Sequence, residues 1–376
     1  MKLYNPFPEY GYFGPEYFCD REEETERLAD ALFNGSNVTL MAPRRIGKTG
    51  LIHHVFNQMK RRDKNVQCFY VDIFSTKTFS QMVQFLANAI VGKLDSPSQS
   101  VRRKLNAFVT SLRPTMTADP LTGMPTFSFT VEPENARQTL EQVFQYMKDS
   151  EKECFLAIDE FQQVTRYSEL SVDALIRSII QFIPNVHIIF SGSQQHILAD
   201  MFMSPEHPFF NSSQIMTIKE IDRSRYKAFA NGFFSKQKRE MTEEAFSLLY
   251  DMVDGQTWYV QKILNRLYRT PNGNLDANDI RGAVNSIIGE QEINYQNSYN
   301  LLTENQAKLL TAIACQRVVA SPTALEFVMR YRLPAPSSIK MALQSMQDRE
   351  ILFHDPSRGY MVYDRFFGMW LKRLAT

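Results

Sequence analysis

The chain has 376 residues, of which 44% are hydrophobic, so it is long enough for two or three domains with sizeable cores. Its charges balance to a formal +1, so net charge gives no reason to expect nucleic acid as a partner. The sequence has no run of eighteen apolar residues, so no membrane partner is expected. The four cysteines lie far apart without metal-ligand spacing, which favours a reducing, cytoplasmic location.

The N-terminal part predicts an aromatic arm followed by a helix. Residues 1–17 are rich in Pro, Tyr and Phe and show no periodicity. The helix expected next contains Leu28 and Leu32 and ends at Asn34-Gly35.

The following stretch has the features of a phosphate-binding loop. An apolar run ending at Met41 leads into the loop, and an amphipathic helix follows it. In this context the loop N–H groups and the helix N-terminus favour an anion at one point. Lys48 is predicted to reach the β- and γ-phosphates of a nucleoside triphosphate, and the Thr49 hydroxyl to ligate Mg²⁺. The predicted nucleotide-binding residues are Ala42, Pro43, Arg44, Arg45, Ile46, Gly47, Lys48, Thr49 and Gly50.

One loop position departs from the usual pattern G-x-x-x-x-G-K-[ST]. Ala42 occupies the place of the first glycine, so the tight turn must form with a Cβ present, and Pro43 is expected to stiffen it. The apolar arm before this stretch is placed to cover an adenine ring, although a plain packing arm explains its composition equally well. Both interpretations of the arm stay open.

The alternation of strands and helices continues and is then interrupted. Val66–Phe74 predicts a strand and residues 79–94 predict a helix. Within residues 101–133, apolar residues such as Phe127 and Phe129 alternate with polar ones, after several turn-forming residues. A peripheral hairpin is expected here, and we interpret it as an addition to the core fold rather than as a contact site for a partner.

A second motif, Cys154–Glu160, ends in two carboxylates. Its apolar residues predict a buried parallel strand, and ligands bind at the C-terminal edge of such strands in open α/β sheets. Asp159 suits Mg²⁺, directly or through water, and Glu160 is then left to orient and polarise the water that attacks the γ-phosphate. A strand ending in a solvated acidic turn is the alternative, which the upstream loop disfavours.

Two more strands complete the predicted sheet. Val186–Phe190 leads into Ser191-Gly192-Ser193-Gln194-Gln195, and Gln214–Ile218 is expected to be the fifth strand. Helices are expected between the strands, over about 134–147 and 172–182. This alternation indicates an α/β fold, a doubly wound parallel sheet with helices on both faces.

Four pieces in this order, FCDREEETERL, MAPRRIGKTGL, FLAIDEF and IIFSGSQQHIL, resemble the archaeal-type ATPases of the STAND/AAA+ group of P-loop NTPases. Members commonly carry an F-x-x-R-x-x-E opening, a P-R-R-x-G-K-T loop, an Asp-Glu strand end and a Gly-Ser after the next strand. The resemblance implies adenine as the base and a polar residue after the fourth strand that senses the γ-phosphate. Ser193 and Gln194 are both candidates, and an N-cap role for Ser193 is the structural alternative.

Only helices are predicted from Asp222 to about residue 299, and in the resembled family such a bundle forms a lid over the nucleotide. The family carries a Gly-x-Pro here that approaches the nucleotide, whereas Thr257 stands at the Pro position in this chain. The expected helices cover about 222–236, 242–252, 257–269 and 276–295.

The C-terminal part predicts a winged helix, with three helices followed by two short strands joined at Asp355–Gly359. The third helix of this fold can enter the major groove of DNA. Here that helix offers Lys340 as its one cation, whereas a DNA reader shows a denser basic footprint. A regulatory or protein-contact role is therefore favoured over DNA binding.

The chain is predicted to bind ATP and Mg²⁺ and to act as an ATP-hydrolysing molecular switch, with an unidentified protein partner or self-association. The catalytic candidates are Lys48, Glu160, Ser193 and Gln194, and the metal ligands are Thr49 and Asp159. A nucleotide-gated DNA-binding regulator and an ATP-locked scaffold with negligible turnover are the alternatives. The arginine that stabilises the transition state stays open among Arg44, Arg45, Arg177, Arg223 and Arg225.

The predicted domains are three. A nucleotide-binding core with the N-terminal arm and the peripheral insertion covers residues 1–220, a helical lid covers 221–299, and a winged helix covers 300–376.

Overall fold

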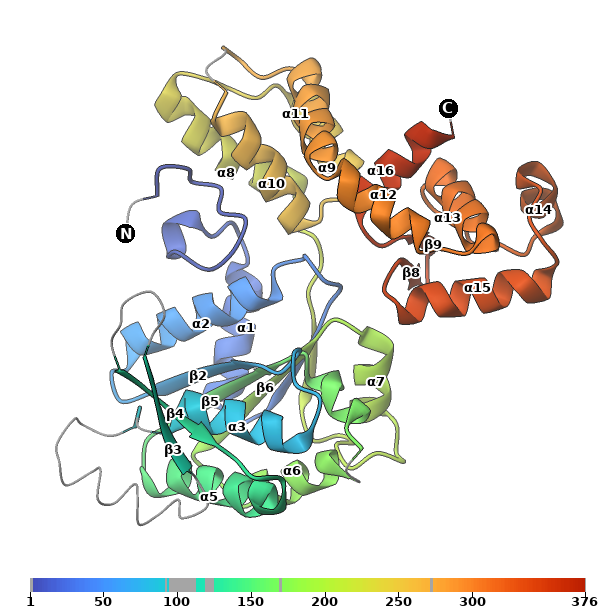
Figure 1. Ribbon diagram of the computed structural model, residues 1–376. Helices are drawn as coiled ribbons and strands as arrows, with labels where there is room; N and C mark the ends of the chain where they lie inside the picture. The colour runs from blue at the N-terminus through green and yellow to red at the C-terminus, as the bar shows by residue number, and fades with distance from the viewer. Residues whose placement is uncertain are drawn as a thin grey trace. The chain divides into compact units, whose positions relative to one another are not determined.

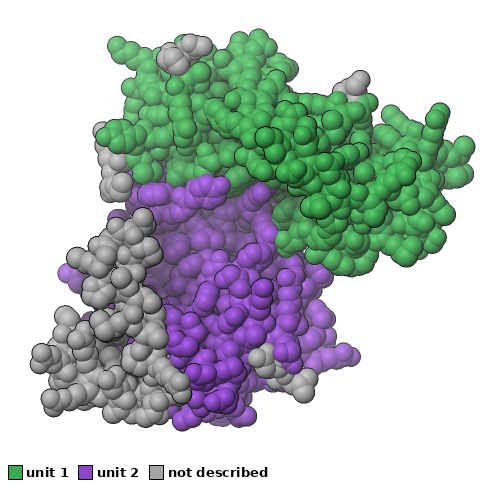
Figure 2. Space-filling view, in the orientation of Figure 1, with its two compact units in different colours: residues 1–9, 222–376 green, residues 10–221 purple. Residues whose placement is uncertain are grey.

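The computed structural model describes residues 3–91, 93–94, 113–118, 125–168, 171–270 and 273–375, with the backbone alone for 113–118 and 125–128. The chain divides into two compact units, one of residues 10–221 and one of residues 1–9 with 222–376 (Figures 1 and 2). Among the helices of the described residues, none is both long and apolar enough to cross a membrane.

The first unit, residues 10–221, is built on a five-stranded sheet with the order β2-β5-β6-β1-β7. Its paired strands all run parallel, which confirms the predicted topology. The central strands β5 and β6 are buried along their whole length, as expected of strands covered on both faces. The strands are β1 Val38–Met41, β2 Gln67–Asp72, β5 Cys154–Asp159, β6 Val186–Gly192 and β7 Gln214–Thr217.

Helices cover both faces of this sheet, and the alternation along β5 shows how (Figure 1). Phe155 and Ala157 belong to a core shared with α1 and α2, whereas Leu156 and Ile158 belong to a core shared with α3, α5, α6 and α7. Successive strand residues therefore face opposite helical layers. The helices are α1 Glu22–Phe33, α2 Lys48–Arg62, α3 Phe79–Ile90, α5 Ala136–Asp149, α6 Val172–Ile180 and α7 Gln195–Met203.

Smaller elements complete this unit. Strands β3, Arg113–Ala118, and β4, Pro125–Thr130, pair antiparallel, which confirms the hairpin expected within residues 101–133. Most of the remainder of that stretch lies outside the described residues. Short 3₁₀ helices occur at Pro15–Tyr17, Pro133–Asn135 and Phe161–Arg166.

The second unit contains the predicted helical bundle and winged helix together. Three helices precede the two short strands of the winged helix, as predicted, and an additional helix, Arg365–Leu374, was not predicted. The helix expected over 276–295 breaks at Gln291, which separates α11 from α12. The elements are α8 Arg223–Phe234, α9 Glu243–Met252, α10 Thr257–Tyr268, α11 Ala277–Glu290, α12 Glu292–Asn300, α13 Glu304–Gln316, α14 Leu325–Tyr331, α15 Pro336–Asp348, β8 Leu352–Asp355, β9 Gly359–Val362 and α16 Arg365–Leu374, with a 3₁₀ turn at Ser235–Gln237.

The N-terminal arm is divided between the two units, whereas the sequence assigned residues 1–17 to the nucleotide-binding core. Phe7 is fully buried in the second unit, and its ring lies 5.5–6.3 Å from four aromatic rings there. Asn265 Nδ2 donates to the carbonyl of Phe7 at 2.7 Å, and Lys262 pairs with Glu9 at 2.9 Å. For residues 3–9 the structure therefore shows a packing arm. The four rings belong to Phe229, Phe233, Phe234 and Tyr268.

Candidate functional site

The strand order brings three loops together at the carboxyl edge of the sheet. Because β6 lies between β1 and β5, the residues after β6 lie between the loop that follows β1 and the acidic residues that end β5. Ligands bind at this edge in open α/β sheets. The loop that contains Lys48 and Thr49 and the acidic strand end therefore meet at one edge of the sheet.

The loop after β1 takes a backbone path that depends on left-handed residues. Gly47 has φ 105° and is the N-cap of α2, so the helix starts at Lys48. Arg45 has φ 68°, a conformation that costs a side-chain-bearing residue about 1 kcal/mol. Ala42, at the place of the usual first glycine, is fully buried in the core with α1 and α2. Its methyl group therefore contributes to packing, which explains how the loop forms with a Cβ at that position.

Lys48 is held against its own loop. Its side chain is buried, and Nζ donates to the carbonyls of Ala42 at 3.0 Å and Pro43 at 3.2 Å. Burial lowers the pKa of Lys48, while the charges of Asp159 and Glu160 act in the opposite direction. The ammonium is thus desolvated, satisfied by two neutral acceptors, and close to two carboxylates.

Thr49 and Asp159 are in direct contact across the sheet edge. Thr49 Oγ1 donates to Asp159 Oδ2 at 3.0 Å, and the backbone N–H of Glu160 donates to the other carboxylate oxygen at 3.0 Å. The hydroxyl and the carboxylate that were predicted as metal ligands therefore lie side by side.

Tyr70, on β2, also contacts Asp159 and was not predicted. Its hydroxyl donates to the same oxygen, Oδ2, at 2.6 Å. Burial, followed by the charge of Asp159, raises the pKa of Tyr70 well above its usual range. The sequence offered one signal for Tyr70, a phenol two residues before the aspartate that ends its strand. The contact itself follows only from the sheet order, in which β2 pairs with β5.

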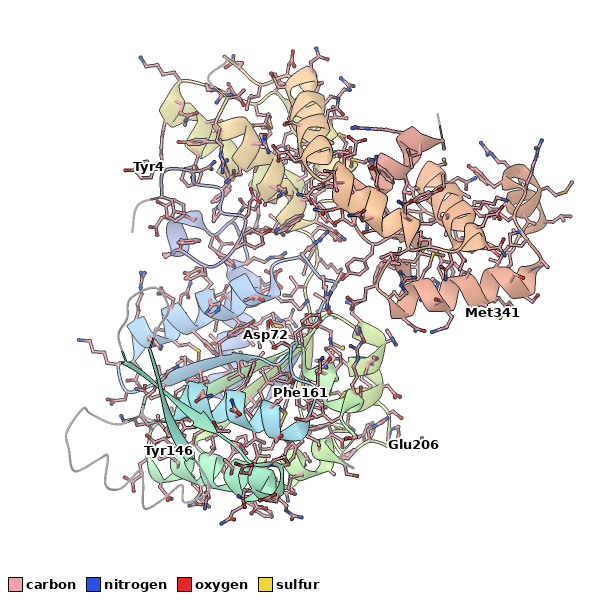
Figure 3. The ribbon with its side chains drawn as sticks, in the orientation of Figure 1. Tyr4, Asp72, Tyr146, Phe161, Glu206 and Met341 are labelled. Atoms are coloured by element: carbon pink, nitrogen blue, oxygen red, sulfur yellow. The ribbon has the colours of Figure 1, made fainter. Side chains whose placement is uncertain are left out.

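Glu160 is held by side chains from three segments. Ser193 Oγ donates to its Oε2 at 2.8 Å, and Gln162 Nε2 donates to the same oxygen. Arg44 Nε lies 4.0 Å from Glu160 Oε1 and donates to Ser193 Oγ at 3.3 Å. The backbone of Glu160 has φ 56°, a strained conformation that persists when surrounding contacts determine it. Phe161, the next residue, is fully buried and provides such an anchor (Figure 3).

A third carboxylate, Asp72, lies at the same edge (Figure 3). Asp72 is directly opposite Asp159 in the β2–β5 register. Burial raises the pKa of Asp72, and the negative charges of Asp159 and Glu160 raise it further. The edge is therefore rich in negative charge, which a cation would offset.

The two predicted sensor candidates occupy different places. Ser193 contacts Glu160, as described above, whereas Gln194 is the N-cap of α7 without a side-chain capping bond. The structural alternative, Ser193 as the N-cap of that helix, is therefore wrong. Among the five arginine candidates, Arg44 contacts Glu160 and Ser193, and Arg45 lies in the same loop. Arg177, on α6, bonds Gln181, and Arg223 and Arg225 belong to the other unit.

Arg21 supports the loop from behind and is a further residue for which the sequence gave no role. It is 4% exposed, donates to the carbonyl of Ile46 at 3.3 Å, and pairs with Glu24 at 2.8 Å. Both belong to the F-x-x-R-x-x-E opening, so that motif ties α1 to the phosphate-binding loop.

Several solved structures have a fold similar to that of this chain. Solved structures of similar fold include a Walker-type ATPase of Pyrococcus abyssi, with a TM-score of 0.65, 15% identity, and 98% of this chain and 99% of that one covered. ORC2 of Aeropyrum pernix in ADPNP–ADP complexes has a TM-score of 0.60 at 13% identity, covering 98% and 96%. ORC1 of Aeropyrum pernix in complex with DNA has a TM-score of 0.55 at 13% identity, covering 98% and 96%. At these identities the likeness concerns the fold.

Family models match both units, while no curated protein matches the chain at a significant level. A model described as a probable winged helix domain matches residues 293–373, which confirms that fold for the C-terminal part. A model described as an ATPase domain predominantly from Archaea matches residues 18–263. Since this match spans more than half of the 376 residues and includes the loop and the acidic strand end, the chain belongs to that family of archaeal-type ATPase domains.

Proposed function

We propose that the chain binds ATP with Mg²⁺ at residues 42–50 and hydrolyses it, so that its nucleotide state acts as a molecular switch. The observation that carries the proposal is the hydrogen bond of 3.0 Å between Thr49 Oγ1 and Asp159 Oδ2. It joins the last side chain of the phosphate-binding loop to the acidic strand end. The ADPNP and ADP held by ORC2 of Aeropyrum pernix, a protein of similar fold, support an adenine nucleotide.

The donor set fits Mg²⁺. A hydroxyl and a carboxylate are hard oxygen ligands, which this ion prefers, and it keeps several waters and phosphate oxygens in its shell. Among the described residues no group of three or more His, Cys, Asp or Glu could hold a metal ion by itself, so phosphate oxygens would have to complete the shell. When bound, Mg²⁺ would neutralise charge on the β- and γ-phosphates.

Lys48 and the loop backbone bind the phosphates in this proposal. The Lys48 ammonium exchanges its two carbonyl acceptors for phosphate oxygens, which are charged and therefore bind it more strongly. The positive end of α2, which begins at Lys48, faces the same anion.

Glu160 orients and polarises the attacking water, and Ser193 positions Glu160. Because Ser193 comes directly after β6, the strand between β1 and β5, and its Oγ donates to the Glu160 carboxylate, we expect it also to sense the γ-phosphate. Arg44 is the cation nearest to this pair and is the proposed arginine for charge developing on the transferred phosphoryl group.

The test is phosphate release by the wild type and Glu160→Gln, with ATP binding followed in parallel by thermal shift. Glu160→Gln is expected to lower release at least about 100-fold, as loss of a positioned general base does, while ATP still stabilises the protein. Lys48→Ala is expected to lose both effects. If ATP with Mg²⁺ leaves the melting temperature of the folded wild type unchanged, the nucleotide proposal fails. Stabilisation by ATP without any release points instead to the ATP-locked scaffold.

A nucleotide-gated DNA-binding regulator is the second candidate, because the chain has a winged helix and a fold like that of ORC1 in complex with DNA. Lys340 is exposed on α15, whereas Arg358 pairs with Asp254 at 3.1 Å. Duplex binding that falls with salt and weakens in Lys340→Ala would favour this candidate. Binding that Lys340→Ala leaves unchanged would leave the regulatory or protein-contact role for the winged helix.

A further inference from the structure

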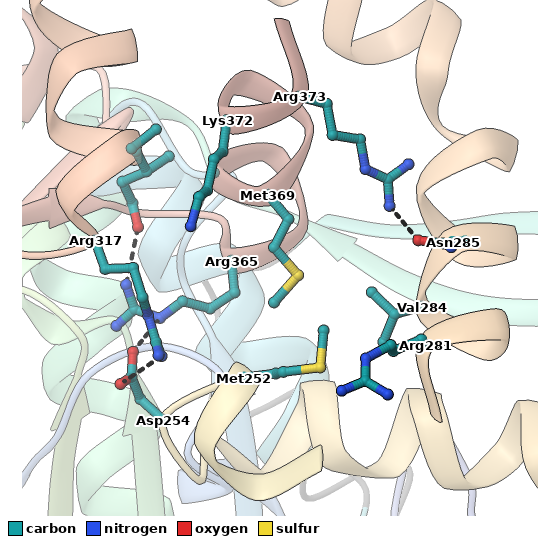
Figure 4. Close-up of a pocket in the computed structure, with 13 residues that line it drawn as sticks. Met252, Asp254, Arg281, Val284, Asn285, Arg317, Arg365, Met369, Lys372 and Arg373 are labelled. Carbon is teal, nitrogen blue, oxygen red and sulfur yellow. Dashed lines mark hydrogen bonds and ion pairs between the residues drawn. The ribbon is translucent and has the colours of Figure 1, made fainter. Parts of the chain in front are cut away.

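The second unit contains a cavity far in sequence from the phosphate-binding loop. Its volume is about 490 Å³, a size typical of sites for small organic molecules. Its walls come from the end of α9 and from α11, α13, β9 and α16 (Figure 4). The cavity therefore lies where the helical bundle packs against the winged helix within one compact unit.

Positive charge dominates the lining. The lining contains five cationic side chains and one carboxylate, that of Asp254, which leaves an excess of four positive charges. Low-dielectric walls of one sign focus the field and attract an anion. The cationic residues are Arg281, Arg317, Arg365, Lys372 and Arg373.

The one acidic residue of the lining, Asp254, already pairs with several arginines. Three arginines reach Asp254: Arg317 at 3.2 Å, and Arg358 and Arg365 at 3.1 Å each. The Arg365 side chain is about 10% exposed, and burial lowers its pKa despite the nearby carboxylate. One carboxylate cannot balance three guanidinium groups, so this end of the cavity keeps an excess of positive charge that an anionic ligand would offset.

Apart from Asn285, the remainder of the lining is apolar. Met252 and Met369 point toward one another in the middle of the cavity, and Val284 lies beside them on α11 (Figure 4). Methionine sulfur makes favourable contacts with aromatic rings, and guanidinium groups stack on them. At the far end Arg373 donates to Asn285 Oδ1, so that arginine is fixed on the rim.

We propose that this cavity binds a small phosphate monoester with an aromatic body, as a second ligand site separate from the ATP site. The phosphate would be held by Arg317 and Lys372, which lie on the same side of Met252 and Met369 (Figure 4) and whose charged donors match its oxygens. The aromatic body would lie between Met252 and Met369. Asp254 lies in the short segment between α9 and α10. A ligand that draws Arg317 away from Asp254 would therefore remove a contact of this segment.

The experiment measures binding of 1-naphthyl phosphate to the full-length protein by calorimetry. The wild type is expected to bind it one to one, and inorganic phosphate and 1-naphthol each at least tenfold more weakly. The double variant Arg317→Ala/Lys372→Ala is expected to bind at least tenfold more weakly, and the matched control Arg349→Ala, on the exposed surface of the winged helix, to bind like the wild type.

Two further variants distinguish a loss of probe binding at this cavity from misfolding and from binding at the ATP site. Met369→Trp, which fills the cavity without removing a charge, is expected to abolish binding, and Lys48→Ala to leave it unchanged. The proposal is overturned if the wild type does not bind the probe at millimolar concentration. It is also overturned if Lys48→Ala loses binding while the double variant keeps it, because the probe would then occupy the phosphate-binding loop.

Discussion

Asp159 Oδ2 accepts hydrogen bonds from two hydroxyl groups, Thr49 Oγ1 and Tyr70 Oη, although it is also the proposed metal ligand. The shorter contact, 2.6 Å, is that of Tyr70. A carboxylate oxygen with two donors has less capacity left for a cation, so nucleotide binding with Mg²⁺ should require one donor to turn away. Tyr70 is the better candidate, since Thr49 is needed as a ligand.

Tyr70→Phe tests this competition. Without nucleotide the change should lower the free energy of unfolding by about 2 kcal/mol, because it removes a hydrogen bond to a charged group. With ATP and Mg²⁺ the loss should shrink, since the wild-type tyrosine has by then released Asp159. Urea unfolding under both conditions measures it, and an equal loss with and without nucleotide would contradict the competition.

The site shows which contacts a sequence can predict. Lys48, Thr49, Asp159 and Glu160 carry local patterns, a loop between strand and helix and an acidic strand end, and their proximity follows once the sheet is parallel. Tyr70 and Gln162 carry no such pattern. Their contacts depend on which strand lies beside β5 and on the left-handed turn at Glu160, and neither is encoded in hydrophobic periodicity.

At the scale of elements, α1 and the phosphate-binding loop are joined by one buried arginine. Arg21 is the N-cap residue of α1, with φ 76°, and donates to the loop carbonyl of Ile46. The start of the helix is thus joined to the loop by a hydrogen bond that is buried away from water.

Arg21→Ala should therefore weaken both stability and nucleotide binding. Removing one partner of a largely buried pair costs about 3 kcal/mol, and the loop loses a fixed point, so ATP affinity should fall as well. Arg27→Ala, an exposed arginine on the same helix, is the matched control. Thermal shift with and without ATP measures both quantities, and a loss of stability with unchanged ATP affinity would limit Arg21 to a structural role.

Helix α2 carries two histidines whose titration should make the first unit sensitive to acid. Burial is the main cause that lowers the pKa of His53 and of His54 below 6.5. Below pH 6.5 the unfolded chain then binds more protons than the folded one, so stability must fall as the pH decreases from about 6.5. His54 is also bonded to Tyr12 at 3.0 Å and to Gln58 at 2.8 Å, whereas the His53 ring contacts Tyr70.

His53→Gln should reduce this acid sensitivity, because glutamine does not titrate. The measurement is the change in melting temperature between about pH 7.5 and pH 5.5, a range that spans the ordinary histidine pKa. His196→Gln, at an exposed position on α7, should leave the change as in the wild type. If His53→Gln and the wild type lose stability equally, His53 does not contribute.

At the scale of the whole molecule, the start of the N-terminal arm lies in a different unit from the one to which the sequence assigned it. Its aromatic residues show no period, and composition alone does not say which surface they pack on. The structure assigns residues 1–9 to the unit of 222–376, although the chain then enters the other unit. Two compact units are thus connected twice, before Tyr10 and after Ile221, so the nucleotide-binding unit is an insertion between parts of the second unit.

Phe7→Ala should therefore destabilise the second unit and leave the sheet of the first intact. The side chain is fully buried among four aromatic rings, and such a truncation costs about 3–5 kcal/mol. Hydrogen exchange read by mass spectrometry should show lost protection in α8 and α10 with unchanged protection in β5 and β6. Tyr4→Ala, at a fully exposed residue of the same arm, is the control and should change neither (Figure 3). Lost protection in β5 and β6 as well would mean that the two units unfold together. The two compact units would then not be independently stable.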